Sequence, residues 1–136
     1  MEIAPYLIFN GNCAEAFPFY ERVLGGRIVM MQTHGESPMK DQVGADWHDK
    51  VLHARMEAGN FVLMGSDAPP SEAAVSPRDM HVSVSTGAAD AERLFNALAA
   101  GGRVTMPFEK TFWSPGFGMV VDRFGTPWMV NTDPAR

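Results

Sequence analysis

Apolar residues recur at helical spacing in two segments of the chain, and each segment stops at a pair of glycines. In residues 13–24 and 88–100, apolar side chains three and four positions apart form one stripe, which is typical of an amphipathic helix with one buried face. Glycine is favoured just beyond a helix end because it adopts a left-handed backbone conformation without steric cost. We therefore expect two helices that end at Gly25-Gly26 and at Gly101-Gly102. The stripes consist of Phe17, Tyr20, Val23 and Leu24 and of Ala91, Leu94, Phe95 and Leu98.

The two glycine pairs belong to an internal repeat. Gly25-Gly26-Arg27-Ile28-Val29-Met30 returns as Gly101-Gly102-Arg103-Val104-Thr105-Met106, at an offset of 76 residues, and such self-similarity indicates repeated structural units. A short alternating run precedes each helix, at residues 3–9 and 80–85, and three strand-like runs follow it. The sequence therefore predicts an α+β fold made of two tandem modules, each with the order strand, helix, strand, strand, strand.

The ends of the modules locate an insertion and a linker. Residues 64–67 match residues 130–133 at an offset of 66, so the first module holds about ten extra residues, which we place in a loop at residues 35–49. Three prolines and little periodicity mark residues 68–77 as a linker. The predicted organisation is a single domain in which module one covers residues 1–67 and module two covers residues 78–136.

The first helix has a polar start and an interior proline. Asn12, followed three positions later by Glu15, matches a capping box and predicts that the helix begins at Cys13. Pro18 then removes one backbone hydrogen bond inside the helical pattern. Two outcomes are open at this point: a kink at Pro18, or a helix that begins later than Cys13.

Alternation along two of the strands predicts which side chains share a face of the sheet, because successive strand residues point to opposite sides. The apolar series is expected to pack beneath the helices and consists of Leu52, Ala54 and Met56 and of Met80, Val82 and Val84. The opposite series is polar. It supplies the candidate site, whose members are His53, Arg55, His81 and Ser83.

Composition and charge exclude several classes of partner. The 136 residues are 46% hydrophobic and 20% charged, as in one ordinary globular domain, and no apolar run approaches the length of about 20 residues that spans a bilayer. We expect no membrane partner and a cytoplasmic location. The net charge is −5 and the 11 lysines and arginines are scattered, so nucleic acid is not an expected partner. The single cysteine, Cys13, is expected to pack in the core, and covalent catalysis is not expected.

Several short strings, in order along nearly the whole chain, are similar to the PhnB-like branch of the vicinal-oxygen-chelate superfamily, also called the glyoxalase/bleomycin resistance/dioxygenase superfamily. They are Pro5-Tyr6-Leu7, Phe19-Tyr20, Lys50-Val51-Leu52-His53-Ala54, Leu63-Met64-Gly65-Ser66-Asp67, Met106-Pro107, Thr111-Phe112-Trp113, Phe117-Gly118, Asp122-Arg123-Phe124-Gly125 and Trp128-Met129. Some domains of this branch are called demethylubiquinone methyltransferases. The sequence does not support that activity, because it has no glycine-rich turn of a Rossmann-like unit.

The resemblance implies a curved mixed sheet that forms a cup with the helices outside. It also implies four metal-ligand positions on the first and last strands of the modules, which the internal repeat assigns to Pro5, Leu63, His81 and Met129. Of these, only the imidazole of His81 suits a hard or borderline metal. We therefore expect no metal and no cofactor.

The histidines and the arginine of the candidate site each have a structural alternative. His53 is either a partly buried histidine with a backbone or serine partner, or a general base or hydrogen-bond donor to a substrate. A structural and a functional role are likewise both open for His81. Arg55 either neutralises an acidic ligand or pairs with Glu57, which shares its face.

Three tryptophan segments carry further expectations. Trp113 either forms an aromatic wall over a flat ligand or packs in the core or at an interface. Trp47-His48-Asp49 either acts as a lid or makes a dimer contact. Trp128 lies next to Met129 and should point in the opposite direction, into the core.

Three functions remain open from the sequence. The first is a binding protein that encloses a small apolar or aromatic molecule without a metal, which the ten methionines favour because their side chains adapt to irregular ligands. The second is a metal-dependent lyase, isomerase or dioxygenase with an unorthodox site around His81. The third is an interaction module whose cup is filled by its own side chains. The resemblance and the small size of the chain also predict a homodimer.

Overall fold

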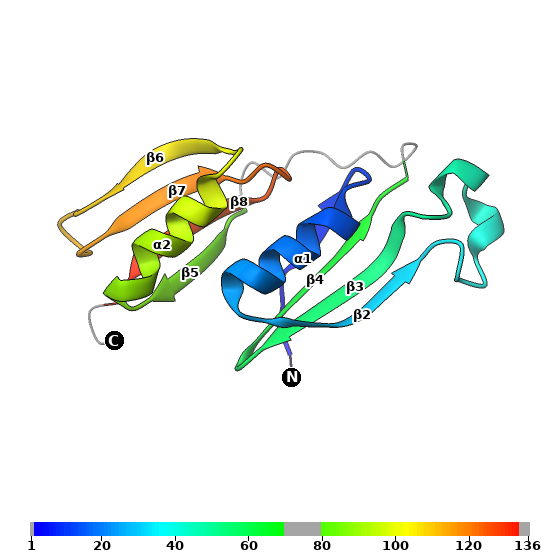
Figure 1. Cartoon of the computed structure of the whole chain (residues 1–136), viewed down its shortest axis with the longest axis horizontal. Helices are drawn as coiled ribbons and strands as arrows, with labels where there is room; N and C mark the ends of the chain where they lie inside the picture. Colours follow the sequence, from blue (N-terminus) through cyan, green and yellow to red (C-terminus); the bar gives the residue numbers. More distant parts are fainter. Residues whose placement is uncertain (1, 70–79, 134–136) are drawn as a thin grey trace. The chain divides into compact units, whose positions relative to one another are not determined.

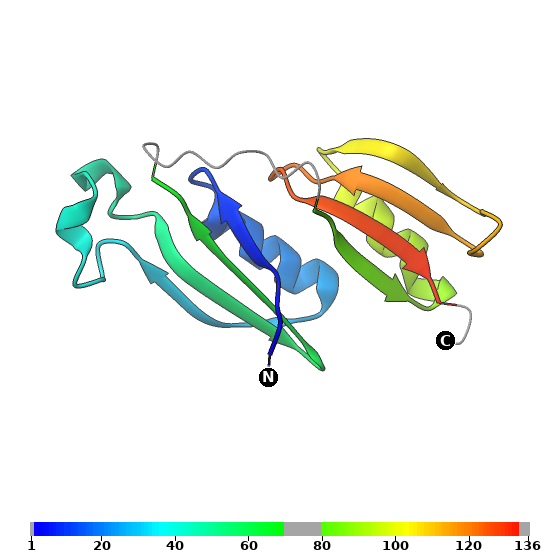
Figure 2. The same ribbon diagram turned by 180° about the vertical axis from the view of Figure 1, so that it is seen from behind.

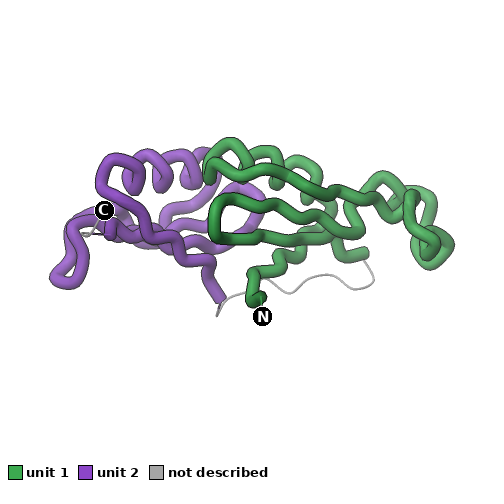
Figure 3. Tube along the Cα trace, turned by 90° about the horizontal axis from the view of Figure 1, so that it is seen from below, with its two compact units in different colours: residues 1–75 green, residues 76–136 purple. Residues whose placement is uncertain are grey.

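Each half of the sequence repeat forms one four-stranded sheet with a single helix packed on it, as the computed structural model of the chain shows (Figure 1). The structure describes residues 2–69 and 80–133. It divides into two compact units, residues 1–75 and residues 76–136 (Figure 3). The predicted linker at residues 68–77 lies largely outside the described residues.

The order of elements confirms the predicted repeat of strand, helix and three strands. Unit 1 contains β1 (Tyr6–Phe9), α1 (Cys13–Leu24), β2 (Arg27–Thr33), β3 (Val51–Ala58) and β4 (Phe61–Asp67). Unit 2 contains β5 (Val82–Thr86), α2 (Ala88–Ala99), β6 (Arg103–Glu109), β7 (Phe117–Val121) and β8 (Pro127–Thr132).

Both sheets are mixed and have the same topology. Their strand orders are β1-β4-β3-β2 and β5-β8-β7-β6, with a parallel pairing of the first and last strands of each unit and antiparallel pairings elsewhere. Within each unit the helix covers one face of its sheet (Figure 1), and Figure 2 looks onto the opposite face. The predicted α+β, glyoxalase-like fold is therefore confirmed.

The helices are held by aromatic side chains that pack on small residues of the sheets. In unit 1, the buried rings of Phe9, Phe17 and Tyr20 contact one another, and Phe17 lies so close to Gly65 that a Cβ atom there would be 2.7 Å from its ring. In unit 2, Phe95 lies equally close to Gly118. Each glycine thus admits the ring of the covering helix, since any side chain would displace it.

The helix ends confirm one prediction and correct another. Gly25 follows α1 with a left-handed backbone (φ 75°), and its amide bonds to Glu21 O at 3.1 Å, as expected of a helix stop. At the other end Asn12 makes no side-chain cap. The carboxylate of Asp67 accepts the Cys13 amide instead, at 3.0 Å, so the predicted capping box is wrong.

Helix α1 begins at Cys13 and continues through Pro18. The expectation of a later start is therefore wrong. Pro18 is exposed, so its ring lies on the solvent side of the helix, where the loss of a backbone hydrogen bond is offset by water.

The insertion lies where the repeat predicted it. Residues 34–50 connect β2 to β3 and contain two short 3₁₀ turns, η1 (Lys40–Gln42) and η2 (Ala45–Trp47), whereas residues 110–116 connect the equivalent strands of unit 2. Among the described residues, no helix is both long enough and apolar enough to cross a membrane.

The predicted strand faces hold for most residues and fail near two strand ends. Ala54 and Met56 are fully buried, but Val51 is buried in place of Leu52. The cause is a β-bulge, because the pairing of β2 with β3 shifts between Gln32 and Thr33 and so reverses the alternation. Met80 is 75% exposed because β5 begins only at Val82.

Candidate functional site

The sheet of unit 1 has a helix-free face, which we define as the side opposite α1. One row of this face crosses all four strands, since Tyr6 pairs with Met64, Met64 with Arg55, and Arg55 with Met30. Residues that pair across strands share a face, and every member of this row is partly or fully exposed. The sequence predicted Arg55 on this face. It missed Tyr6, Met64 and Met30, which the strand register brings beside it.

His53 lies on the same face and forms a polar cluster with Tyr6. The Tyr6 hydroxyl lies 2.9 Å from His53 Nδ1, and the two rings stack with their centroids 5.6 Å apart. Burial raises the pKa of Tyr6, while a hydrogen bond with Ser66 acts in the opposite direction. The phenol therefore stays protonated at neutral pH, and this cluster can bind a ligand through hydrogen bonds. The partner of His53 is thus the Tyr6 hydroxyl rather than the backbone or serine group that the sequence suggested.

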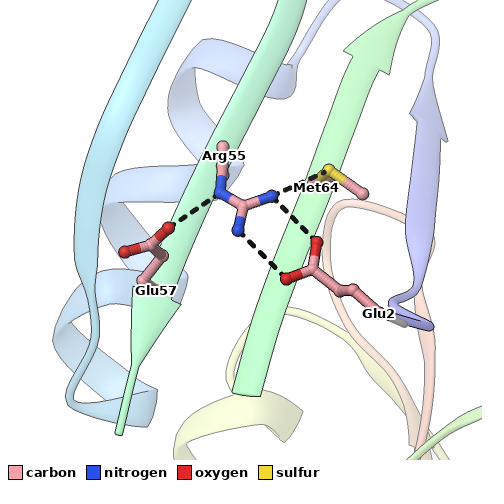
Figure 4. A network of polar contacts seen from close by, with 4 residues as sticks. All are labelled: Glu2, Arg55, Glu57 and Met64. Carbon is pink, nitrogen blue, oxygen red and sulfur yellow. Dashed lines mark hydrogen bonds and ion pairs between the residues drawn. The ribbon is translucent and has the colours of Figure 1, made fainter. Parts of the chain in front are cut away.

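Arg55 is surrounded by two carboxylates and a thioether (Figure 4). Its Nε donates to Glu57 at 2.8 Å, and its two terminal nitrogens donate to the two oxygens of Glu2 at 3.1 and 3.2 Å. The Met64 sulfur lies 3.8 Å from Nη1. Hydrogen bonds with Glu2 and then with Glu57 raise the pKa of Arg55, and Arg55 in turn lowers the pKa of Glu2. Pairing with Glu57 was one of the two roles that the sequence left open for Arg55, whereas the contact with Glu2 was not foreseen.

Unit 2 has an equivalent helix-free face, opposite α2, whose central row is rich in methionine. Ser83 pairs with Met129, Met129 with Met119, and Met119 with Met106. Three thioethers on neighbouring strands therefore lie side by side, and methionine side chains adapt readily to the shape of an apolar ligand. Ser83 is exposed on this face, as the alternation predicted.

The row beside the methionines contains an unpaired acceptor and an aromatic wall. Asn131 pairs in register with Phe117, and its Oδ1 atom is buried with no hydrogen-bond partner in the described part of the chain. The Trp113 ring packs edge-on against Phe117 at 5.4 Å and remains 52% exposed. Trp113 therefore lies at one end of this face, on the loop between β6 and β7.

The structure groups the predicted site residues into two sets. His53 and Arg55 share the helix-free face of unit 1, whereas Ser83 and Trp113 belong to unit 2. His81 is exposed and precedes the first residue of β5 by one position. The two sets belong to separate units, each with its own helix-free face.

The backbone corrects the predicted equivalence of the two modules by one residue. Tyr6 pairs with Met64 as Ser83 pairs with Met129. Matching hydrogen bonds between backbone atoms follow the two pairs, from Ala68 N to Phe9 O in unit 1 and from Asp133 N to Thr86 O in unit 2. The number of residues between each pair and its bond is the same in both units, so the two pairs are equivalent. The counterpart of Met129 is therefore Met64, and the assignment of Leu63 is wrong, since Leu63 is 2% exposed beneath α1.

With Met64 in place of Leu63, the positions assigned to a metal are Pro5, Met64, His81 and Met129, and they do not fit a divalent ion. His81 alone offers an imidazole, and the residues paired with the two methionines, Tyr6 and Ser83, add only a protonated phenol and a hydroxyl. Zn²⁺, Mn²⁺, Fe²⁺ and Ni²⁺ prefer several imidazole, carboxylate or thiolate donors. Across residues 2–69 and 80–133, no three His, Cys, Asp or Glu side chains are placed to hold a metal together.

Two other features that the sequence singled out lie away from these faces. Cys13 is fully buried, and its pKa is raised above the ordinary range by burial and then by the charge of Asp67, so the thiol is not a nucleophile. Trp47, in the inserted loop, packs next to Gly11 and lies under the Lys50 ammonium group at 6.0 Å. This loop is thus fastened to the turn between β1 and α1.

Comparison with known proteins agrees with this geometry. The family model described as Glyoxalase/Bleomycin resistance protein/Dioxygenase superfamily matches residues 2–130. The chain belongs to this superfamily. Protein YjdN of Escherichia coli K12 is 37% identical, and the match covers 96% of this chain and 95% of YjdN.

Two solved structures are similar over nearly their full lengths. The crystal structure of protein PA1353 from Pseudomonas aeruginosa is 49% identical, with a TM-score of 0.89 and 98% coverage of both chains. The PhnB protein from Bacillus cereus is 21% identical, with a TM-score of 0.82 and coverage of 98% of this chain and 100% of that chain. The family match and these relatives place the chain in the PhnB-like branch of the superfamily.

Proposed function

We propose that this superfamily member binds a small, partly apolar or aromatic molecule on its helix-free sheet faces and does so without a metal. The observation that carries the proposal is the row of Met106, Met119 and Met129, which occupies the centre of the face of unit 2. A row of adaptable apolar side chains binds an apolar ligand through contact area rather than through coordination.

Polar and aromatic groups beside the methionines support the same proposal. The exposed Ser83, which pairs with Met129, offers a hydroxyl to a ligand, and the exposed ring of Trp113 can stack on a flat one. In unit 1, Tyr6 and His53 offer a second polar contact. Few polar groups on a largely apolar surface are typical of small-molecule sites.

Binding is tested with a panel of hydrophobic and aromatic compounds. A ligand of the folded state raises the midpoint of thermal unfolding by mass action, by an amount that grows with its concentration. We also expect it to quench tryptophan fluorescence, since Trp113 borders the face. If no compound of a broad panel changes either signal, the chain is an interaction module instead.

The absence of a metal is tested by elemental analysis of the purified protein. We expect less than stoichiometric Zn, Mn, Fe and Ni, because the ligand positions lack suitable donors. One such ion per chain that disappears in His81→Ala would instead support the metal-dependent lyase, isomerase or dioxygenase. Replacement of the partly exposed His48, in the inserted loop, by alanine serves as the control for loss of an imidazole.

We place this function in the cytoplasm and in a homodimer. A single buried cysteine is compatible with a reducing compartment. The association of two chains would cover apolar side chains that lie exposed on the sheets, among them Ile8 and Val104.

A further inference from the structure

Arg55 presents a fork of two donors in the centre of the helix-free face of unit 1. Nη1 and Nη2 bond to the two oxygens of a single carboxylate, that of Glu2, at 3.1 and 3.2 Å (Figure 4). This planar arrangement of two parallel bonds is the geometry with which arginine recognises carboxylates in general. The chain therefore contains both a carboxylate-binding group and a carboxylate bound to it.

The two acidic partners of Arg55 differ in how firmly they are held. Glu57 lies on the same strand two residues away and bonds to Nε at 2.8 Å. Glu2 lies four positions before β1 begins, outside any strand, and its side chain is 52% exposed. An exposed ion pair contributes little to stability because water solvates its separated charges well. Glu2 is thus the partner that a competing carboxylate can replace.

We infer that the fork of Arg55 is the binding site for the carboxylate of a small ligand, and that Glu2 occupies this site until the ligand displaces it. The inference rests on the proposed function, because the ligand's apolar or aromatic body would lie on the neighbouring Met64 and Met30. It goes further by naming a carboxylate as the ligand's polar group and the N-terminal segment as an internal competitor.

The charges around Arg55 favour a carboxylate over a phosphate. Because Glu57 bonds to Nε, the edge of the guanidinium that a ligand can use is the one formed by Nη1 and Nη2. That edge matches a single group with two oxygens. Exchange of Glu2 for another carboxylate leaves the local charge unchanged. A phosphate dianion would add a further negative charge close to Glu57, and like charges at short range repel.

The test compares 2-naphthoate with its neutral analogue 2-naphthamide by isothermal titration calorimetry on the full chain. Removal of an internal competitor raises the fraction of protein that is competent to bind, and apparent affinity follows that fraction. Since an exposed ion pair is weak, we expect Glu2→Ala to raise the affinity for naphthoate by about fivefold. The affinity for naphthamide should not change. Glu92→Ala, at an exposed position of α2, removes the same charge elsewhere and should leave both affinities as in the parent chain.

Variants of Arg55 separate the shape of the fork from its charge. In the Glu2→Ala background, Arg55→Met should abolish the preference for naphthoate, and Arg55→Lys should retain only part of it, since lysine has charge without a planar fork. The inference is overturned if Glu2→Ala leaves naphthoate affinity unchanged or if Arg55→Met retains the preference. If either of those two results is found while naphthamide still binds, the inference about Arg55 is refuted but the proposed binding of an aromatic ligand is not. If neither compound binds any variant, both the inference and the proposed aromatic-ligand function fail.

Discussion

Asp67 stabilises three segments of unit 1 at once. It is fully buried, and one carboxylate oxygen accepts the amides of Gly11 and Cys13 while the other accepts the amide of Val51. The single side chain thus joins the turn before α1 to the start of β3. It also takes the place of the helix cap that Asn12 was predicted to provide.

Replacement of Asp67 by alanine should be strongly destabilising. Two buried amides, those of Cys13 and Val51, and the part-buried amide of Gly11 would lose their acceptor, and each unsatisfied buried amide costs about 1–3 kcal/mol. We expect the free energy of unfolding of the variant, measured in urea, to fall by at least about 3 kcal/mol. Asp49→Ala, at an exposed position of the inserted loop, should change it by less than about 0.5 kcal/mol.

Cys13 should be unreactive and should contribute to a loss of stability at alkaline pH. Burial, and then the charge of Asp67, raise the pKa of the thiol in the folded state. In the unfolded chain the Cys13 thiol ionises near the ordinary pKa of about 8.5. The contribution of the buried thiol to stability is therefore complete below that pH and declines above it. We expect a thiol reagent to label the protein only in denaturant. Between about pH 8 and pH 10 the stability of Cys13→Ala should decline less steeply than that of the parent chain; equal slopes would contradict this assignment.

Trp128 is the largest fully buried side chain, and its Nε1 donates to Asp122 at 2.8 Å. Truncation to alanine leaves a large cavity and should lower the free energy of unfolding by about 3–5 kcal/mol. Denaturant unfolding followed by circular dichroism measures this loss. A near-neutral effect would mean that the strand places this ring outside the core.

At the scale of elements, strand register decides which side chains meet on the helix-free faces. The bulge at Val29 of β2 brings Met30 opposite Arg55, and the bulge at Leu52 of β3 buries Val51 in place of Leu52. A loop adds a further side chain, Trp113, to the edge of the helix-free face of unit 2. In the connection between β6 and β7, the buried Ser114 hydroxyl donates to Gly116 O at 2.8 Å, so Trp113 is held on a loop with fixed internal hydrogen bonds.

Trp113→Ala should weaken ligand binding without affecting the fold. The ring is half exposed and contacts Phe112 and Phe117, so its loss removes a wall of the face but little of the core. For a compound identified by the panel, we expect the Kd to rise by about tenfold, measured by calorimetry, with thermal unfolding nearly unchanged. Should Trp113→Ala unfold the chain while Trp128→Ala leaves it stable, the strand register would be off by one residue.

At the scale of the whole molecule, each unit buries only one side of its sheet under its own helix. Units of this size bury a modest share of their surface, and in unit 1 the other side carries apolar residues such as Ile8 and Met30, each more than 40% exposed. Association of two chains is the usual way to cover such surfaces in symmetric oligomers.

We therefore predict a homodimer. Light scattering at micromolar concentration should give a mass of about 30 kDa, twice the 14.9 kDa of one chain. Ile8→Glu, which places a charge on this exposed apolar surface, should shift the mass toward that of one chain. A monomeric parent chain would contradict the prediction.

The sequence by itself determined the elements and their order. Helical stripes, glycine stops and the repeat gave both helices, the two sets of strands and the position of the insertion, because these signals are local along the chain. They also placed Trp128 in the core and His53 on the face opposite Ala54. Local alternation suffices for such assignments as long as a strand is regular.

Only the tertiary structure decided the register of the strands and the contact partners of individual side chains. The bulge at Leu52 and the one-residue shift that makes Met64 the counterpart of Met129 come from hydrogen bonds between strands distant in sequence. The same holds for Glu2, which lies 53 positions from Arg55, and for Asp67, whose amide partners come from two other segments of the chain. The alternation of residues along a strand shows which face a side chain is on. Which residue it contacts depends on the register between strands that are distant in the sequence.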